Sequence, residues 1–292
     1  LARMVAKPRY QRMLNAELDC KYADVMEQAL YNCVLAGVSL DGSRFFYANR
    51  LAAYPKLMDR KISGQHFTTF RQEWFDCACC PPNVARLLAS LGTYTASVSD
   101  SMLALHLYAA GEIGVQIGGS RTTFAIETEY PWDGKVRITV SPESAAKFTL
   151  CLRLPGWCAS PALKVNGKKA DLKKMTKSGY AHLEREWKSG DMVELDLPME
   201  VERLRAHPAV RQAAGMVALR RGPIVYCLEE CDNGEDLAAI SLPGNAKLSA
   251  KMEKMLGGCI TISGKAQRLD AKGWGADLYA NKPHGRKEVN IK

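Results

Sequence analysis

The chain has 292 residues, and 40 Lys or Arg against 31 Asp or Glu give it a formal charge of +9. At roughly 100–200 residues per domain, this length predicts two or three domains. Hydrophobic residues make up 47% of the chain and charged residues 24%, and these ordinary values exclude a disordered or collagen-like protein. No apolar run approaches the ~18 residues of a membrane-spanning helix, so we expect no membrane partner.

The basic residues are spread along the chain, and acidic residues are interleaved with them almost everywhere. A nucleic-acid-binding surface needs a basic stripe with aromatic residues between the charges, and the sequence has none. We therefore interpret the net charge as a solvated surface and expect no nucleic-acid partner. The chain begins at Leu1 without the long apolar core and cleavage site of a signal peptide, so we expect a piece of a longer protein.

The first hundred residues have a helical pattern. Over residues 22–36, apolar side chains recur three and four positions apart, which predicts an amphipathic helix with Gly37 as its C-cap. Residues 40–47 contain Asp-Gly and predict a hairpin turn. Pro81 and Pro82 predict the start of a second helix, because the first helical turn does not need the missing N–H of proline.

Beyond about residue 97, apolar and polar residues alternate in several short runs. Strands of this length that are separated by Gly, Pro and Asn-Gly predict an antiparallel sandwich. Residues 198–207 mark a change of unit, and a second β-rich stretch follows. We predict three domains, at residues 1–97, 98–200 and 201–292, and expect the two β-rich units to fold without the helical segment. The alternating runs are 102–108, 122–128, 136–140, 148–154 and 192–197.

The chain contains ten cysteines, which is many for an intracellular protein of this size. Because the chain is long enough to bury its own cores, we expect free thiols rather than a disulfide framework. Cys33 lies on a helical apolar stripe, and Cys151 and Cys227 lie in strand-like runs. We therefore expect these three thiols to be buried.

Three further thiols lie within four residues, at Cys77, Cys79 and Cys80, directly before the second predicted helix. The positive end of a helix dipole lowers the pKa of a thiol, and a thiolate is both a nucleophile and a soft metal ligand. A zinc ribbon needs a second Cys-x-x-Cys pair, which the sequence lacks, and the cluster does not match a thioredoxin-like redox motif. The residues alone leave metal binding, nucleophilic catalysis, redox chemistry and structural thiols open.

Several motifs carry a family resemblance, and the most specific of them is Cys77-Ala-Cys-Cys-Pro-Pro-Asn83. With these motifs the sequence resembles glycoside hydrolase family 127, the β-L-arabinofuranosidase family, over most of its length. The other matching segments are Tyr22-Ala-Asp-Val-Met-Glu-Gln-Ala-Leu-Tyr-Asn32, Phe45-Phe-Tyr-Ala-Asn49, Tyr130-Pro-Trp132, Leu152-Arg-Leu-Pro-Gly-Trp-Cys158, Trp187-Lys-Ser-Gly-Asp191 and Arg221-Gly-Pro-Ile-Val-Tyr-Cys-Leu-Glu229.

The resemblance implies an α+β multidomain fold, in which the end of an (α/α)6 catalytic barrel is followed by two antiparallel β-sandwich domains. It implies a retaining glycoside hydrolase whose nucleophile is the first Cys of the Cys-Cys-Pro-Pro-Asn motif, here Cys79. The second Cys, here Cys80, is a zinc ligand, and Cys79 also binds the zinc as a thiolate. Tyr47 is implied to line the sugar site. The expected cofactor is zinc, and the expected partner is an arabinose-containing oligosaccharide or glycan.

Two parts of the family's site are expected to be absent. The family's other zinc ligands form a Glu-x-Cys motif, and its acid/base is a Glu upstream of that motif. No Glu-x-Cys occurs among the 21 residues before Tyr22. In Glu17-Leu-Asp-Cys20, two residues rather than one separate the Glu from the Cys. Cys77 could supply a third sulfur but no proton donor. We therefore expect a truncated barrel and a chain that is not a competent hydrolase by itself, unless a carboxylate replaces the acid, with candidates at Glu17, Glu27 and Glu73.

An alternative hypothesis is a non-catalytic carbohydrate-binding or oligomerising β-sandwich module, and a homodimer through a sandwich is implied by the resemblance. Trp132 and Trp157 could stack on a sugar, although sandwich tryptophans are more often core residues. Glu127 and Glu129 lie two apart on a strand, and we interpret them as a solvated sheet face rather than an acid pair. A working thiolate needs reducing conditions, which favours a cytoplasmic location.

Overall fold

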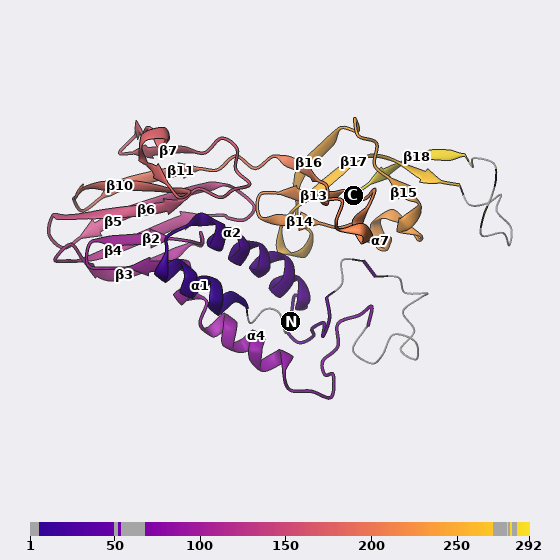
Figure 1. Cartoon of the computed structure of the whole chain (residues 1–292), viewed down its shortest axis with the longest axis horizontal. Helices are drawn as coiled ribbons and strands as arrows, with labels where there is room; N and C mark the ends of the chain where they lie inside the picture. Colours follow the sequence, from indigo (N-terminus) through magenta and orange to yellow (C-terminus); the bar gives the residue numbers. More distant parts are fainter. Residues whose placement is uncertain (1–5, 50–51, 54–67, 271–278, 280, 282–284) are drawn as a thin grey trace. The chain divides into compact units, whose positions relative to one another are not determined.

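The computed structural model describes residues 6–49, 52–53, 68–270, 279, 281 and 285–292 (Figure 1). The chain divides into two compact units. Unit 1 comprises Leu1–Met199 with Gly222–Ile224, and unit 2 comprises Glu200–Arg221 with Val225–Lys292. Among the residues described, no helix is long and apolar enough to cross a membrane.

Unit 1 begins with the helices α1 (Ala6–Ala16) and α2 (Cys20–Ala29), drawn in indigo in Figure 1. The Asp19 carboxylate caps α2 by accepting a hydrogen bond from the backbone N–H of Lys21. A π-helical turn, η2 (Leu30–Val34), and a 3-10 turn, η3 (Leu35–Gly37), continue α2, so the predicted helix over 22–36 is confirmed. Its predicted end is wrong in detail, because Gly37 belongs to the 3-10 turn and the extended Val38 caps it.

The apolar stripe of this helical run is buried. Ala23, Met26, Leu30 and Val34 are each at most 5% exposed, and they form one cluster with side chains of α1, α4 and α5. Cys33 is exposed, so its predicted burial is wrong. Leu30 and Val34, four residues apart, carry the buried stripe through the π-helical turn, so the intervening Cys33 lies outside it.

The segment after the helical run has little regular structure. Val38 and Phe45 form a single β-bridge, so the predicted hairpin over 40–47 is reduced to one isolated pair. Phe45 also bridges to Gln72, which brings the two arms of this segment together. The second predicted helix is confirmed as α4 (Cys80–Ala89), with prolines in its first turn, and α5 (Gly92–Thr95) follows it.

The rest of unit 1 is a sandwich of two sheets. Its strand pairs are antiparallel apart from β2 and β6, which are parallel. One sheet has the spatial order β1 (Ala96–Val98), β2 (Met102–Leu105), β6 (Ala146–Arg153), β10 (Tyr180–Trp187) and β9 (Thr176–Lys177), with the short α6 (Leu172–Met175) before β9. The other sheet has the order β3 (Gly111–Ile117), β4 (Ser120–Thr128), β5 (Lys135–Pro142), β11 (Asp191–Asp196), β7 (Ala162–Val165) and β8 (Lys168–Lys169).

Alternate residues of these strands form the core, as the period of two predicts. Phe124 of one sheet and Phe148 of the other meet edge to face with ring centroids 5.8 Å apart. Trp157 is 8% exposed, which confirms it as a core residue, whereas Trp132 is half-buried. Glu127 and Glu129 are exposed, which confirms a solvated sheet face.

Unit 2 contains two smaller sheets and a thin core. The side chains below 9% exposure among its described residues are Ile262, Ala266 and Ile291. Cys151 of unit 1 is buried as predicted, but the predicted burial of Cys227 is wrong, because this residue follows the end of β14 and is exposed. The strands are β12 (Val201–Leu204), β13 (Ala218–Arg221) and β14 (Ile224–Tyr226) in one sheet, and β15 (Ile240–Ser241), β16 (Leu248–Glu253), β17 (Cys259–Leu269) and β18 (Arg286–Ile291) in the other. The helical turns are η4 (Arg211–Ala213), α7 (Glu230–Asn233), η5 (Leu237–Ala239) and η6 (Met255–Gly257).

Candidate active site

The thiol cluster lies at the N-terminus of α4. Cys79 is the N-cap residue and Cys80 is the first residue of the helix. The Cys79 side chain is exposed, whereas Cys80 is 3% exposed, and their sulfur atoms lie 3.3 Å apart. The Asn83 side chain donates a hydrogen bond to the Cys79 carbonyl and accepts one from Arg86, which fixes this first turn. The motif therefore presents one outward and one inward thiol.

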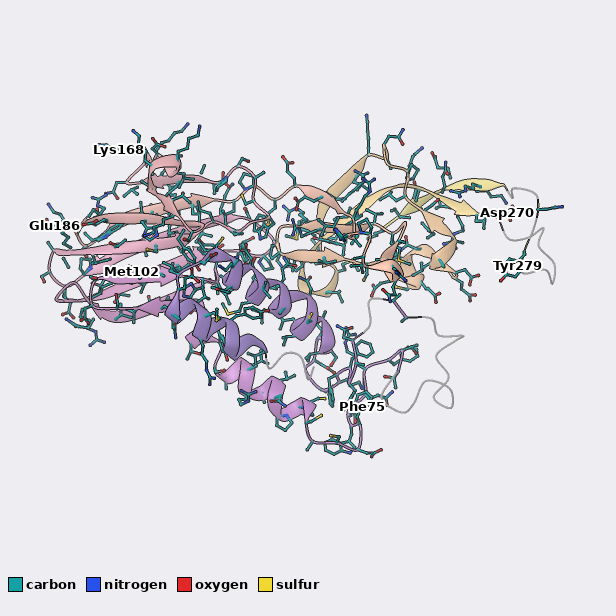
Figure 2. The ribbon with its side chains drawn as sticks, in the orientation of Figure 1. Phe75, Met102, Lys168, Glu186, Asp270 and Tyr279 are labelled. Atoms are coloured by element: carbon teal, nitrogen blue, oxygen red, sulfur yellow. The ribbon has the colours of Figure 1, made fainter. Side chains whose placement is uncertain are left out.

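Aromatic side chains surround the inward thiol. Phe45 and Phe75 lie with ring centroids 5.4 Å apart, and Cys80 packs in the same cluster. Phe75 is labelled in Figure 2. Tyr47 packs against Phe75 with ring centroids 5.8 Å apart. Asp76, directly before the cluster, has a φ of 53°, a left-handed conformation that Asp tolerates better than most residues. The resulting turn brings the motif back towards the aromatic cluster.

The two adjacent thiols have opposite electrostatic environments. Hydrogen bonds with Cys80 and then Cys77 and Tyr47 lower the pKa of Cys79 below the usual thiol value. Burial, reinforced by the neighbouring Cys79, raises the pKa of Cys80 to about 12. The charge on Cys79 is in turn the main cause of a raised pKa at Tyr47. The arrangement favours a thiolate at Cys79 with protonated neighbours that donate to it.

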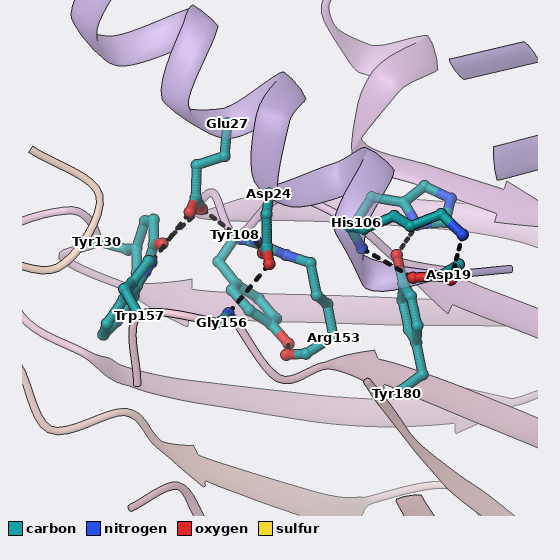
Figure 3. Close-up of polar contacts among 11 residues, drawn as sticks. Asp19, Asp24, Glu27, His106, Tyr108, Tyr130, Arg153, Gly156, Trp157 and Tyr180 are labelled. Carbon is teal, nitrogen blue, oxygen red and sulfur yellow. Dashed lines mark hydrogen bonds and ion pairs between the residues drawn. The ribbon is translucent and has the colours of Figure 1, made fainter. Parts of the chain in front are cut away.

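A second polar cluster lies between α2 and the sandwich of unit 1 (Figure 3). The fully buried Arg153 forms ion pairs with the fully buried Glu27 and with Asp24. Tyr130 and Trp157 also donate hydrogen bonds to the Glu27 carboxylate. The backbone N–H of Gly156 donates to Asp24, and the Tyr108 hydroxyl donates to the Arg153 carbonyl. We call these residues the Arg153 network.

His106 extends the polar interior of unit 1. It is 1% exposed, and one ring nitrogen lies 2.8 Å from the Tyr180 hydroxyl (Figure 3). The other ring nitrogen lies 2.9 Å from the Ser97 hydroxyl. Burial, together with the nearby Arg153 charge, lowers the pKa of His106 to about 4. The ring is therefore neutral at neutral pH and shares its hydrogen bonds with two hydroxyl groups.

Comparison with known proteins places this geometry in one family. Three family descriptions match successive parts of the chain: the β-L-arabinofuranosidase GH127 catalytic domain at residues 8–93, the GH127 middle domain at 102–199 and the glycoside hydrolase family 127 C-terminal domain at 201–268. The chain belongs to glycoside hydrolase family 127. Both the helical part with the thiol cluster and the sheet domains therefore match GH127 sequences.

Individual GH127 relatives agree with this assignment. A non-reducing end β-L-arabinofuranosidase of Bifidobacterium longum subsp. longum is 38% identical over 283 residues, which are 93% of this chain and 42% of the relative. The structure of a GH127 β-L-arabinofuranosidase from Geobacillus stearothermophilus T6 is 49% identical, with a TM-score of 0.94 over 99% of this chain and 45% of that one. A structure described as a glycoside hydrolase is 35% identical, with a TM-score of 0.88 over 99% of this chain and 48% of that one. The chain thus spans less than half the length of these relatives.

The GH127 motif supplies two sulfur donors of the soft type that zinc prefers. Among the residues that the structure describes, no third His, Cys, Asp or Glu completes a compact ligand group with Cys79 and Cys80. The Glu-x-Cys spacing occurs once in the chain, at Glu229–Cys231, where it was not expected. Its ligand atoms lie within 4.8 Å of each other and of Asp232, but all three side chains are exposed in unit 2.

The three candidate replacements for the GH127 acid have other partners. Glu27 accepts hydrogen bonds from three donors in the Arg153 network. Glu17 accepts a hydrogen bond from the Tyr22 hydroxyl at 3.2 Å. Glu73 is exposed and forms an ion pair with Arg44 at 3.2 Å. Each of these carboxylates is therefore held by a neighbour in this GH127 chain.

The Arg153 network was not predicted from the sequence. One signal for it exists there, because Arg153 interrupts the apolar run of residues 150–154. A charged residue at such a position is almost never fully buried unless it is paired. The pattern could therefore have indicated one buried charge, but not that its partner Glu27 lies 126 positions away.

Proposed function

We propose that the chain carries the nucleophile of a retaining β-L-arabinofuranosidase, and that Cys79 is this nucleophile. The observation that carries the proposal is the exposed Cys79 thiol at the start of α4, with Cys80, Cys77 and Tyr47 as hydrogen-bond partners, in a GH127 chain. A thiol that is exposed and stabilised as a thiolate is suited to attack an electrophilic carbon.

In the proposed reaction, the Cys79 thiolate attacks the anomeric carbon of the terminal sugar. A C–S bond forms as the C–O bond to the leaving group breaks, and the leaving oxygen takes a proton from a carboxylic acid. Water then attacks the same carbon, releases the sulfur as a thiolate and gives its proton to the carboxylate. Two successive inversions retain the configuration of the sugar.

Zinc is the proposed cofactor, with Cys79 and Cys80 as two of its ligands. The 3.3 Å separation of the two sulfurs and their soft donor character fit a shared metal ion. Bound zinc would hold both sulfurs as thiolates, including the buried Cys80, whose pKa is about 12 without metal. The remaining ligands are proposed to come from outside the thiol motif.

The proposed substrate is an arabinose-containing oligosaccharide or glycan, and Tyr47 is proposed to line the sugar site. The name of the Bifidobacterium relative, a non-reducing end β-L-arabinofuranosidase, supports a terminal sugar as the reacting unit. Since Glu17, Glu27 and Glu73 are held by other residues, we propose that the acid/base lies outside the described residues and that the chain by itself turns over poorly. Pairing of two copies through a sandwich stays a prediction that sedimentation velocity can test.

The proposal is tested by incubating the zinc-loaded chain with an aryl β-L-arabinofuranoside, whose leaving group needs little protonation. We expect release of up to one equivalent of phenol and a mass increase of one arabinosyl group on Cys79. Cys79→Ala should abolish both signals, and Cys33→Ala, which removes another exposed thiol, should keep them. Equal phenol release from Cys79→Ala and the unaltered chain would overturn the proposal. Steady turnover of an arabinose disaccharide would instead place an acid within this chain.

A further inference from the structure

Unit 2 contains a hollow of about 220 Å³ that the proposed reaction does not use. It lies among the end of β12, the segment before β13 and the segment after β15. Two of its lining residues, Arg203 and Arg205, are charged, and none of its described lining residues is acidic. Met216, Val217 and Leu242 supply apolar surface on the other sides. The hollow therefore combines two guanidinium groups with a partly apolar wall.

The two arginines lack the carboxylate partner that Arg220 of the same unit has. Arg220, on the neighbouring strand, forms an ion pair with Glu202 at 2.8 Å. In the part of the chain that the structure describes, no carboxylate pairs with Arg203 or Arg205. The positive charge that faces the hollow is thus not neutralised by the protein, unlike the charge on the strand beside it.

Arg203 is held in place and still has an unused donor. Its Nη2 atom donates a hydrogen bond to the carbonyl of Ala246, which fixes the direction of the guanidinium group. Its Nε atom is buried and has no hydrogen-bond partner among the described residues. A buried donor without an acceptor is unfavourable, and such a group commonly indicates an ion or water that completes it. Arg205 is exposed and is free to turn towards the same acceptor.

We infer that this hollow binds a small oxyanion through Arg203 and Arg205. The planar guanidinium group presents paired N–H donors that match the paired oxygens of a carboxylate, sulfate or phosphate. At ~30 Å³ per water, the hollow has the volume of about seven water molecules, so it admits an inorganic oxyanion or a small organic acid. The inference concerns unit 2 alone and does not depend on the proposed role of Cys79.

Calorimetric titration of the full chain tests this inference. The probes are sodium sulfate, sodium phosphate and sodium glucuronate, with glucose as the uncharged counterpart of glucuronate and with NaCl holding the ionic strength constant. We expect one-to-one binding of at least one anion and no heat with glucose. Tighter binding of glucuronate than of the inorganic anions would identify a carboxylate-bearing ligand, and the reverse order would identify an inorganic one.

Substitutions separate a specific site from general charge attraction. Arg205→Gln, at an exposed position, should weaken binding about tenfold or more, and Arg203→Gln should do the same. Lys251→Gln removes one exposed positive charge of unit 2 outside the hollow and should leave binding unchanged. The inference is overturned if no anion binds, or if Arg205→Gln and Lys251→Gln weaken binding equally. Thermal unfolding of each variant without anion shows whether it is folded. If Arg203→Gln does not fold, the exposed Arg205→Gln variant still tests the inference.

Discussion

The Arg153 network and the thiol cluster both gather polar side chains in unit 1, but they differ in burial and pairing. Arg153 and Glu27 are fully buried, and their charges neutralise each other. Cys79 is exposed, and its partners are thiols and a hydroxyl rather than an opposite charge. Buried charges need paired partners to be tolerated, whereas a nucleophile must reach its substrate. This difference supports a structural role for the first cluster and fits the chemical role that we propose for the second.

The helices and the sandwich of unit 1 are joined through the buried cluster. Arg153 is the last residue of β6, and its two carboxylate partners lie on α2. The helical segment and this sandwich belong to the same compact unit, and the boundary between the units follows Met199. Disrupting the Arg153 network therefore tests the expectation that the β-rich region folds without the helices.

The largest expected effect is on stability, from Arg153→Met. This change leaves Glu27 buried without its cation and should lower the free energy of unfolding by about 3–5 kcal/mol. Urea denaturation measures it. Arg185→Gln is the control, because Arg185 and Asp191 form a partly exposed pair 3.6 Å apart, and it should cost about 1 kcal/mol or less. Equal losses in the two variants would contradict the structural role of the network. Adding Glu27→Leu to Arg153→Met should recover part of the loss.

The next effect is a loss of stability in acid that depends on His106. Its pKa is about 4 in the folded chain and ~6.5 when unfolded, so the unfolded state binds more protons between these values. Stability should therefore be full above pH ~6.5 and decrease as the pH falls towards about 4, by up to about 3 kcal/mol. His106→Asn should flatten this part of the pH profile of urea unfolding, and His207→Asn, at an exposed position, should leave it unchanged. An unchanged profile in His106→Asn would refute the assignment.

A third prediction concerns thiol reactivity in the metal-free chain. Cys79 and Cys33 are both exposed, but hydrogen bonds lower the pKa of Cys79, so brief iodoacetamide treatment should label Cys79 about tenfold faster. Peptide mapping measures both rates in one sample. Tyr47→Phe removes one of the hydrogen bonds and should slow the labelling of Cys79 without changing that of Cys33. Faster labelling of the buried Cys151 would contradict the role given to the thiol cluster.

The smallest effect is expected at an exposed pair on the solvated sheet face. Glu127 lies 3.5 Å from Arg137, and both side chains are more than half exposed. Glu127→Gln should change the free energy of unfolding by less than about 0.5 kcal/mol, because water and salt screen such pairs. If Glu127→Gln lowered the free energy of unfolding as much as Arg153→Met, burial would not distinguish the charges that stabilise this chain from those that do not.

The sequence by itself determined the local features of this protein. The alternation of residues set the inward positions of β4 and β5, and the two prolines set the start of α4. These features depend on neighbours within a few positions, where backbone periodicity and turn chemistry act directly. The Cys-Cys-Pro-Pro-Asn motif is specific enough that its residues alone indicate the family.

Only the tertiary structure decided which distant residues meet. The pairing of Arg153 with Glu27, the parallel pairing of β2 with β6 and the position of Tyr47 beside Cys79 join segments far apart in the chain. The exposure of Cys33 depends on which side chains of the helical run pack against other elements, and the apolar spacing alone did not decide it. Such contacts depend on how whole elements pack and on which polar groups must be satisfied once they are buried, and neither can be read from a local pattern.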